Sequence, residues 1–472
     1  MGTFFTHRFS LNKRVVSVAL AAGVSLALMA CEPAPSVYYG GPSGQNVQTG
    51  ADFMTTGIKL DSSFIAEVDS PAKTRAKDLR AFYKDQDYFT TFFRNGRWSW
   101  AGAQSFTAIR NAASEGLRPE DYLPVSMLQS RSLDMIDPRT ADVLLTAGLM
   151  AYMADLHQGA FNPAKKNIGP GLLREGVERR DYNVFLAGIA PKGRSYGALK
   201  SVLNGRKGNL TNTQRRKIAV NMERLRWDHE AAGALRDIRV NIASQSMEVF
   251  ERGRLVHDMT VVVGRKSRKT PVMQDRIVSL KFSPDWTAPR SIVEEDYLDQ
   301  AQADPAYFDQ KGWQVYLDGE KTKSASLDWT TVDLDSITVR QPSGATNALG
   351  GVRFSLTNNQ AIYLHDTNAR SLFKRATRLF SSGCVRVEDA EWLAHWIMGA
   401  EQPSMTMEEI RKNMDLGRPK TVRLDQDVAV SLAYLTVWVD GRNALHWEDD
   451  VYGHDARLMS KMKFPDAWGV NE

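Results

Sequence analysis

Hydrophobic positions follow two different periods along the chain. Between residues 71 and 227, apolar side chains recur three and four positions apart, as in LLTAGLMAYMADLHQG, and this spacing predicts amphipathic helices. The helix in this stretch is predicted to stop at Gly159. From residue 238 onward apolar and polar residues alternate, as in IRVNIASQSMEVFERGRLVHDMTVVVG, which predicts strands joined by a turn at Arg252-Gly253. The pattern therefore predicts an α+β protein, with a helical domain over residues 71–230 and a mostly antiparallel β domain over residues 235–425.

Two further segments belong to the second half of the chain. Residues 284–330 interrupt the alternation with a long polar and aromatic insertion, and insertions of this length in a compact domain are typical of lids or binding loops. Residues 426–472 form a C-terminal extension, in which Asp440-Gly441 predicts the turn of a strand pair.

The first 70 residues read as export and linker signals. Arg8, Lys13 and Arg14 precede an apolar stretch, and this order predicts a signal peptide over residues 1–31. The tetrapeptide LMAC resembles a bacterial lipobox, in which the cysteine, here Cys31, is lipidated. We expect a periplasmic or cell-envelope protein that is lipid-anchored to a membrane, with plain secretion as the alternative. Residues 32–70 are rich in Gly, Pro and Ser, which predicts a flexible linker.

Composition narrows the classes of function. The chain has 472 residues, 43% of them hydrophobic, which is enough for two or three domains with their own cores. The net charge of +5 is spread among both signs, without a basic run interleaved with aromatic residues, so we expect no nucleic-acid partner. Neither zinc-ligand spacing nor a P-loop is present, so we expect no metal and no cofactor. Composition leaves the oligomeric state open.

A candidate site lies in the β domain. In the stretch AIYLHDT, the period of two puts Tyr363 and His365 on one face of a strand and the neighbouring apolar residues on the other. Cys384 follows after a loop, and the stretch EDAEWLAHWIM after it predicts a helix with Asp389 as its N-cap. If Cys31 is lipidated, Cys384 has no partner for a disulfide, and a single thiol in an exported protein is either a small buried hydrophobe or a reactive group.

A histidine close to Cys384 would favour a reactive thiol over a small buried hydrophobe. An imidazolium beside a thiol lowers the thiol pKa and produces an ion pair that is ready to attack a carbonyl. Gly383 allows the backbone to approach a substrate closely, and the amides of Gly383 and Cys384 would then face a developing oxyanion.

These residues resemble a known family. The motif IYLHDT followed by SSGCVRVEDAEWLA is similar to the catalytic signature of bacterial L,D-transpeptidases. RQPSGATNALGGVRF, NMERLRW, FYKDQDYF with EGLRPEDYL, LLTAGLMAYMADLHQG and DDVYGHDARL resemble further segments of the large periplasmic members, which carry a helical scaffold. The chain has serine where the broad family has histidine before Gly-Cys, as the scaffolded subgroup does. The chain leaves no room for the peptidoglycan-binding module that many large members insert before the catalytic domain.

The resemblance implies a fold and a set of roles. The β domain would be sandwich-like, Cys384 would be the nucleophile and His365 the general base. The main-chain carbonyl of Asp366 would orient His365, and Gly383 would shape the oxyanion site.

Four further residues are expected to hold the substrate or shape the site. Tyr363 would contact the substrate or the oxyanion, and Ser382 and Arg386 would shape the catalytic loop. Trp286 is a candidate contact for the stem peptide or glycan, together with Trp313 and Tyr297 of the insertion; the alternative is that these aromatic residues pack the insertion's own core.

The resemblance implies a peptidoglycan L,D-transpeptidase that forms 3→3 crosslinks through a cysteine thioester, with stem peptides as acyl donor and acceptor. Two alternatives stay open. The same thioester could be resolved by water or by a lysine of a tethered protein. From another class, the chain could be a non-catalytic envelope lipoprotein.

Overall fold

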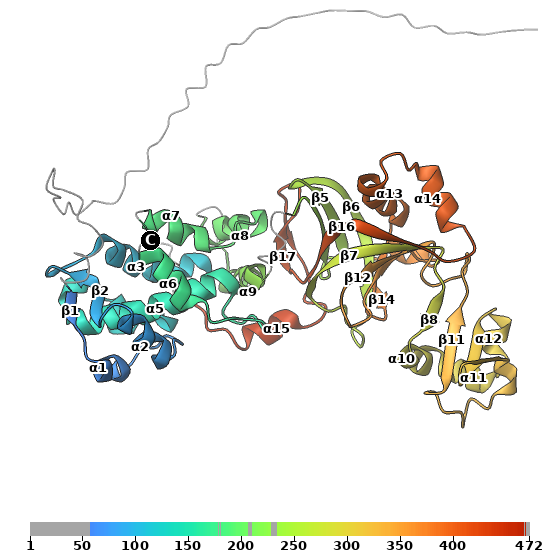
Figure 1. Ribbon diagram of the computed structural model, residues 1–472, viewed down its shortest axis with the longest axis horizontal. Coiled ribbons are helices and arrows are strands. Elements are labelled where there is room, and N and C mark those ends of the chain that lie inside the picture. Colours follow the sequence, from blue (N-terminus) through green and yellow to red (C-terminus); the bar gives the residue numbers. More distant parts are fainter. Residues whose placement is uncertain are drawn as a thin grey trace, which may run out of the picture. The chain divides into compact units, whose positions relative to one another are not determined.

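The computed structural model describes residues 57–466 except 178, 180, 206–209 and 228–233, together with residue 468 (Figure 1). The predicted signal peptide, Cys31 and the linker as far as residue 56 lie outside the described residues. Helices dominate the first half of the described chain and strands the second, which confirms the α+β prediction. Among the helices of this part of the chain, none combines the length and the apolar character that crossing a membrane requires.

The helical domain begins earlier than predicted. Strand β1 (Gly57–Lys59) and helix α1 (Ser62–Glu67) lie in the segment expected to be a linker. The carboxylate of Asp61 caps α1 by accepting a hydrogen bond from the Ser63 amide, and Ile65 is buried in the domain core. The linker prediction is therefore wrong for residues 57–70, because a short capped helix with one buried side chain carries no long apolar pattern.

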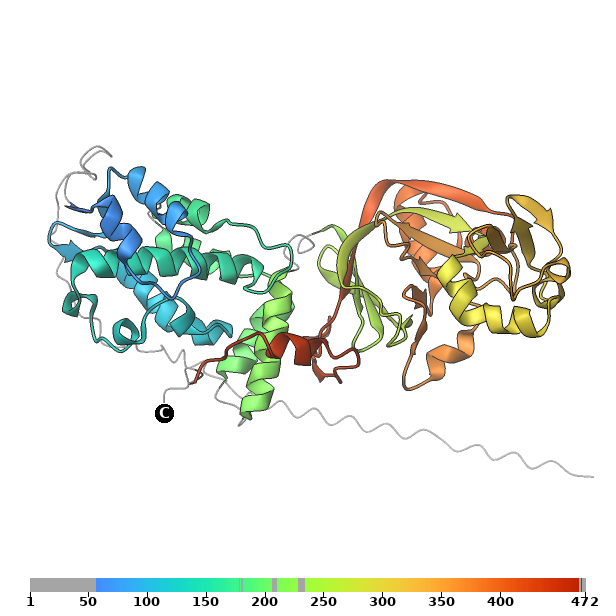
Figure 2. The ribbon, with the colours of Figure 1, turned by 90° about the horizontal axis from the view of Figure 1, so that it is seen from below.

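Helix α5 (Pro138–Gln158) lies at the centre of the helical domain, with other helices packed around it (Figure 2). Asp137 caps its first turn, and the chain leaves it at Gly159, where φ is 86°, as the sequence pattern predicted. The remaining elements are α2 (Ala76–Lys84), β2 (Phe89–Arg94), β3 (Arg97–Trp98), α3 (Trp100–Arg110), α4 (Val125–Leu128), α6 (Gly169–Val177), α7 (Tyr182–Ile189), α8 (Arg194–Asn204) and α9 (Asn212–Trp227).

The β domain is one strongly curved sheet. Its strands run in the order β14-β6-β15-β13-β12-β7-β16-β4-β5, and β6 pairs with both β15 and β5, so that the sheet closes on itself (Figure 1). The strands are β4 (Arg236–Asn241), β5 (Ser246–Glu251), β6 (Arg254–Gly264), β7 (Met273–Phe282), β12 (Val352–Leu356), β13 (Leu364–His365), β14 (Leu379–Ser381), β15 (Val385–Val387) and β16 (Lys420–Ala433). Most neighbours are antiparallel; β13–β15, β14–β6 and β16–β4 are parallel.

The helix after the SSGC motif covers this sheet. Helix α13 (Ala390–Glu401) is capped by Asp389, whose carboxylate accepts a hydrogen bond from the Trp392 amide, as predicted. Leu393 and Ile397 of α13 are fully buried in the core of the β domain. Helix α14 (Met407–Met414) follows. Because one face of β13 and β15 packs against this core, the side chains on the opposite face point away from it.

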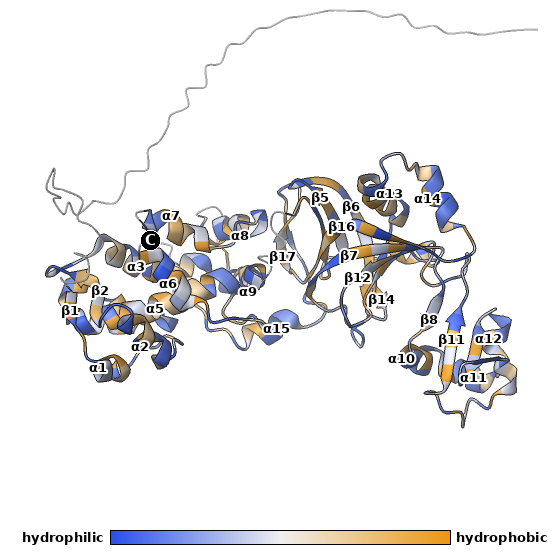
Figure 3. Cartoon of the chain, viewed as in Figure 1, coloured by the Kyte–Doolittle hydropathy of each residue, from blue (hydrophilic) through white to orange (hydrophobic). Residues whose placement is uncertain are grey.

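The insertion is longer than predicted. Strands β8 (Trp286–Ala288), β9 (Gln314–Leu317), β10 (Glu320–Thr322) and β11 (Ile337–Gln341) form a separate antiparallel sheet, accompanied by α10 (Arg290–Ile292), α11 (Leu298–Ala303) and α12 (Tyr307–Gln310). Figure 3 shows hydrophobic and hydrophilic residues alternating along β11. That alternation is a correct strand signal, but the strand belongs to the insertion, which therefore extends past residue 330 to residue 341.

The boundary before the C-terminal extension also moves. Strand β16 continues to Ala433 and pairs with β4 over residues 429–433, so the β domain does not end at residue 425. Strands β17 (Val437–Val439) and β18 (Leu445–Trp447) form the predicted pair around Asp440-Gly441, and α15 (His454–Met459) follows. Thr436 exchanges hydrogen bonds with the side chain of Asn221 on α9.

Candidate active site

Strand register puts the predicted catalytic residues on one face of the sheet. In the parallel pair β13–β15, Leu364 lies opposite Val385, and both are fully buried in the core. The Val385 amide donates to the Tyr363 carbonyl at 3.0 Å, so Cys384 lies beside Tyr363 at the start of this pairing. Because side chains alternate along strands, Cys384 and His365 both point to the face opposite the core.

His365 is held by the main chain that follows it. Its Nδ1 lies 2.5 Å from the carbonyl oxygen of Asp366, and the side chain is 5% exposed. A carbonyl only accepts hydrogen bonds, so Nδ1 carries the proton, and Nε2 of the neutral ring keeps its lone pair. Burial, together with the nearby guanidiniums of Arg386 and Arg353, lowers the pKa of His365 to about 3. The ring is therefore a neutral base at neutral pH.

Cys384 is half-buried, and its thiol lies 3.6 Å from the carbonyl oxygen of Ala361. Burial raises the pKa of the thiol, and the Tyr363 amide and the guanidiniums of Arg386 and Arg353 offset part of the rise. Both pKa directions favour a neutral thiol beside a neutral imidazole. The pKa directions therefore disfavour the ion pair that we expected from sequence, because burial penalises both charged forms.

The catalytic loop, residues 381–384, is fixed by a buried serine. Ser381 is 2% exposed; its hydroxyl donates to the Cys384 carbonyl at 2.5 Å and accepts from the Gly383 amide at 3.1 Å. The hydroxyl of Thr270 donates to the Gly383 carbonyl at 2.8 Å. Gly383 has φ 118°, which L side chains rarely adopt, and a Cβ there would lie 3.2 Å from Ile362. The motif needs glycine at this position for backbone reasons.

The same contact corrects one expectation about the oxyanion. Since the Gly383 amide already donates to Ser381, it does not face open space in this structure. Within the described part of the chain, the Cys384 amide makes no such hydrogen bond.

The carboxylate of Asp366 has a separate, structural task. It accepts a hydrogen bond from the Gly351 amide at 2.8 Å and pairs with Arg370 at 3.2 Å. Gly350, with φ 59°, lies so close that a Cβ would be 2.3 Å from this carboxylate. The side chain of Asp366 thus holds the Gly-Gly segment in place, while its main-chain oxygen faces His365.

Ser382 and Arg386 face the insertion. The Ser382 hydroxyl donates to the Asp296 carboxylate at 3.3 Å, and Asp296 pairs with Arg265 at 2.7 Å. Tyr297, in the π-helical turn Val293–Tyr297, is close enough to Arg386 for each to affect the pKa of the other. The insertion therefore reaches the catalytic loop, as a lid would.

Within the described part of the chain, Trp286 makes no hydrogen bond or ring contact with the catalytic loop. It packs against the core of the insertion, in an edge-to-face contact with Trp313 at 5.8 Å between ring centroids. Tyr297 also lies against Trp313, at 5.1 Å. The structure therefore favours the alternative reading of these aromatic residues, in which they pack the insertion itself.

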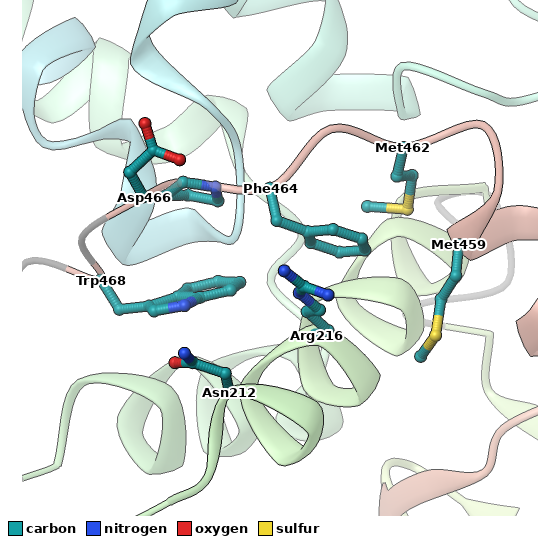
Figure 4. A pocket seen from close by; sticks show the side chains of 8 residues that line it. Asn212, Arg216, Met459, Met462, Phe464, Asp466 and Trp468 are labelled. Atoms are coloured by element: carbon teal, nitrogen blue, oxygen red, sulfur yellow. The ribbon is translucent and has the colours of Figure 1, made fainter.

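A cavity of about 450 Å³ lies elsewhere, between α9 and the C-terminal segment. Figure 4 shows Phe464 and Trp468 directed toward Arg216, and none of the predicted site residues lines this cavity. Among the described residues, no group of three or more His, Cys, Asp or Glu side chains could hold a metal ion.

Comparison with known proteins agrees with this geometry. Residues 236–422 match the family model of the L,D-transpeptidase catalytic domain, and residues 77–203 match that of a scaffold domain. The β domain is thus similar to the catalytic domain of L,D-transpeptidases, and the helical domain before it is similar to a scaffold domain.

Two individual proteins are similar to parts of this chain. A curated Haemophilus influenzae protein named "Putative L,D-transpeptidase" is 36% identical over 247 residues, which cover 51% of this chain and 48% of that protein, so the chain spans about half the length of this relative. A solved L,D-transpeptidase from Mycobacterium smegmatis is 12% identical, with a TM-score of 0.22 over 42% of this chain and 59% of that one.

Three residues of the site were not singled out from sequence. The Ser381 hydroxyl shapes the catalytic loop from within it, and the Thr270 hydroxyl does so from a distant segment of the chain. Arg353, whose guanidinium lies 4.6 Å from the ring centroid of Tyr363, belongs to strand β12. Only Arg353 carried a usable signal, because it is the polar residue between Val352 and Phe354 in an alternating strand.

Proposed function

We propose that this protein is a peptidoglycan L,D-transpeptidase that forms 3→3 crosslinks through a thioester on Cys384. The observation that supports this most directly is the hydrogen bond between His365 Nδ1 and the Asp366 carbonyl, on the same face of the sheet as Cys384. It leaves Nε2 as a proton acceptor on the face of the sheet that also carries the half-buried thiol, and acyl transfer by cysteine requires such a base near the thiol.

The first half of the reaction makes the thioester. As the sulfur of Cys384 attacks the carbonyl between the third residue of a stem tetrapeptide and its terminal D-alanine, its proton passes to Nε2 of His365. The Tyr363 amide and the neighbouring guanidiniums stabilise the thiolate character that develops. The Cys384 amide faces the oxyanion. The C–N bond then breaks, Nε2 returns the proton to the leaving amine, and D-alanine departs.

The second half transfers the acyl group. The amine of an acceptor stem attacks the thioester carbonyl and gives its proton to Nε2, and the C–S bond breaks. The Cys384 sulfur recovers that proton, and a new amide bond joins the two stems. The contact between Ser382 and Asp296 supports a role of the insertion as a lid that limits the access of water to this step.

We also propose an envelope location. The signal-peptide and lipobox patterns ending at Cys31 support export and a lipid anchor, and the sequence from residue 32 to residue 56 is long enough to separate the described domains from a membrane.

Product analysis tests the proposed reaction. Full-length wild-type protein is incubated with disaccharide tetrapeptides, and the products are separated and identified by tandem mass spectrometry. We expect dimers that have lost one D-alanine and carry a 3→3 bond, with none from Cys384→Ala. Tripeptides without dimers would replace transfer by hydrolysis, and unchanged substrate would contradict the enzymatic function.

A further inference from the structure

Two arginines flank His365 on adjacent strands. In the antiparallel pair β12–β13, Arg353 lies directly opposite His365, and in the parallel pair β13–β15, Arg386 lies opposite it on the other side. Val352 and Phe354, the neighbours of Arg353, are fully buried in the core, so Arg353 points to the same face as His365. Across the neighbouring strands β12, β13 and β15, the basic side chain of His365 therefore lies between the cationic side chains of Arg353 and Arg386.

Neither arginine has an acidic partner among the described residues. Arg353 donates one long hydrogen bond, to Ser355 at 3.3 Å, and Arg386 donates none to the residues that the structure describes. The Nε atoms of both are buried without an acceptor. By contrast, Arg265, which faces the insertion, and Arg340, which lies within it, are both paired with carboxylates.

Unpaired cations in a partly buried site are costly. A guanidinium taken from water without a carboxylate loses solvation that its surroundings do not replace. The ring of Tyr363 compensates Arg353 in part, through its face. The acidic residue of the insertion that approaches the loop, Asp296, is already paired with Arg265. Arg353 and Arg386 are therefore arranged to receive an anion that is not part of the described chain.

We propose that Arg353, together with Arg386, binds the terminal carboxylate of the amino acid that leaves the acyl donor. This inference rests on the proposed function. The leaving nitrogen must lie at His365 to receive its proton, and in an α-amino acid the carboxylate is attached to the carbon next to that nitrogen. Residues opposite each other on paired strands have Cα atoms about 4.5–5.5 Å apart. A group bound at His365 thus places its carboxylate beside Arg353.

The proposal has a consequence for substrate choice. A donor must end one residue beyond the bond that is cut, with its carboxylate free. Longer stems, or stems whose carboxylate is already in an amide, would leave both guanidiniums unpaired at the moment of binding. Arg353 is then a residue that determines specificity for the donor.

Binding in the absence of chemistry isolates the subsite. The measurement uses full-length Cys384→Ala protein and a stem tetrapeptide ending in D-alanine, compared with the same peptide ending in D-alanine amide, by isothermal titration calorimetry. We expect the acid to bind roughly tenfold or more tightly than the amide, since charge-assisted hydrogen bonds contribute about 1.5–3 kcal/mol. Adding Arg353→Gln should reduce that preference to less than about threefold, mainly by weakening the acid.

Matched variants separate recognition from a general effect. Arg276→Gln removes an exposed arginine of β7 that pairs with Asp427, and it should leave the preference unchanged. Arg353→Lys keeps the charge and should retain part of the preference. Equal affinity of acid and amide for the parent protein would overturn the proposal, as would no binding of either peptide. An equal loss for both peptides in Arg353→Gln would also overturn it.

The outcome is distinguishable from failure of the proposed function. If the acid binds selectively through Arg353 while the protein with Cys384 intact never forms a thioester with it, the carboxylate subsite stands and the transpeptidase proposal falls.

Discussion

The protonation state of His365 gives a sharp pH prediction. Burial and two neighbouring guanidiniums lower its pKa to about 3, and Nδ1–H donates to the Asp366 carbonyl, so the ring acts as a neutral base. A histidine with a pKa of 3 is about 99% neutral at pH 5, whereas one at the ordinary value of 6.5 is about 3% neutral at pH 5 and about 76% at pH 7.

The acylation rate should therefore be almost flat between pH 7 and pH 5. We expect a change of less than about 1.5-fold, whereas a histidine with an ordinary pKa would produce a fall of about 25-fold. The assay follows acylation of Cys384 by a carbapenem, through the loss of β-lactam absorbance in stopped-flow, at constant ionic strength. The basic limb should lie above the ordinary thiol range, because burial raises the pKa of Cys384.

Stability must be checked in the same buffers. The unfolded chain protonates His365 below about pH 6.5 and the folded chain does not until about pH 3, so the unfolded state binds more protons and folding stability falls as the pH drops. For this one group the loss at pH 5 is about 2 kcal/mol. Circular dichroism should show a folded protein at pH 5. An acid limb near pH 6.5 in protein that is still folded would refute the neutral-base account.

Three further outcomes follow from the structure and sequence. Asp296→Asn, which removes the partner of Ser382, should lower the acylation rate several-fold but shift Tm by less than about 2 °C, because partly exposed ion pairs contribute about 0.2–1 kcal/mol. Glu320→Gln on β10 is the control. Equal effects of the two substitutions on acylation would contradict a lid. Gly383→Ala should destabilise the fold by about 1–3 kcal/mol and abolish acylation. Gly197→Ala in α8, where a Cβ meets open space, should not destabilise the fold. Acylation of Gly383→Ala at the wild-type rate would disprove the need for glycine at this position. Cys31→Ser should move the protein from the membrane to the soluble fraction, and unchanged membrane retention would exclude lipidation there.

Periodic patterns in the sequence predicted several helix ends and turns correctly. The helix that ends at Gly159, the turn at Arg252-Gly253 and the cap at Asp389 all appear where the pattern put them, because each depends on a few neighbouring residues. The placement of Tyr363 and His365 on one face also follows from the period of two alone.

Features that depend on distant residues were not accessible in this way. The strand Ile337–Gln341 was recognisable, but its partners in the insertion were not, since alternation does not specify which sheet a strand joins. The hydroxyl of Thr270 reaches the Gly383 carbonyl from a distant segment, and burial disfavours the charged forms of Cys384 and His365 that we expected. Both depend on packing, which periodicity does not encode.

The most direct test of the central claim is the mass of the protein after exposure to a carbapenem. A β-lactam carbonyl is a strained acyl donor, and a cysteine that opens a peptide bond should open the ring and keep the product as a thioester. We expect one drug molecule added per chain, located by peptide mapping on the peptide that contains Cys384, with no addition to Cys384→Ala and slow addition to His365→Ala. A simple alkylating agent serves as the control for thiol exposure. Wild-type protein that takes the alkylating agent at Cys384 but never the carbapenem would contradict the assignment of Cys384 as an acyl-transfer nucleophile.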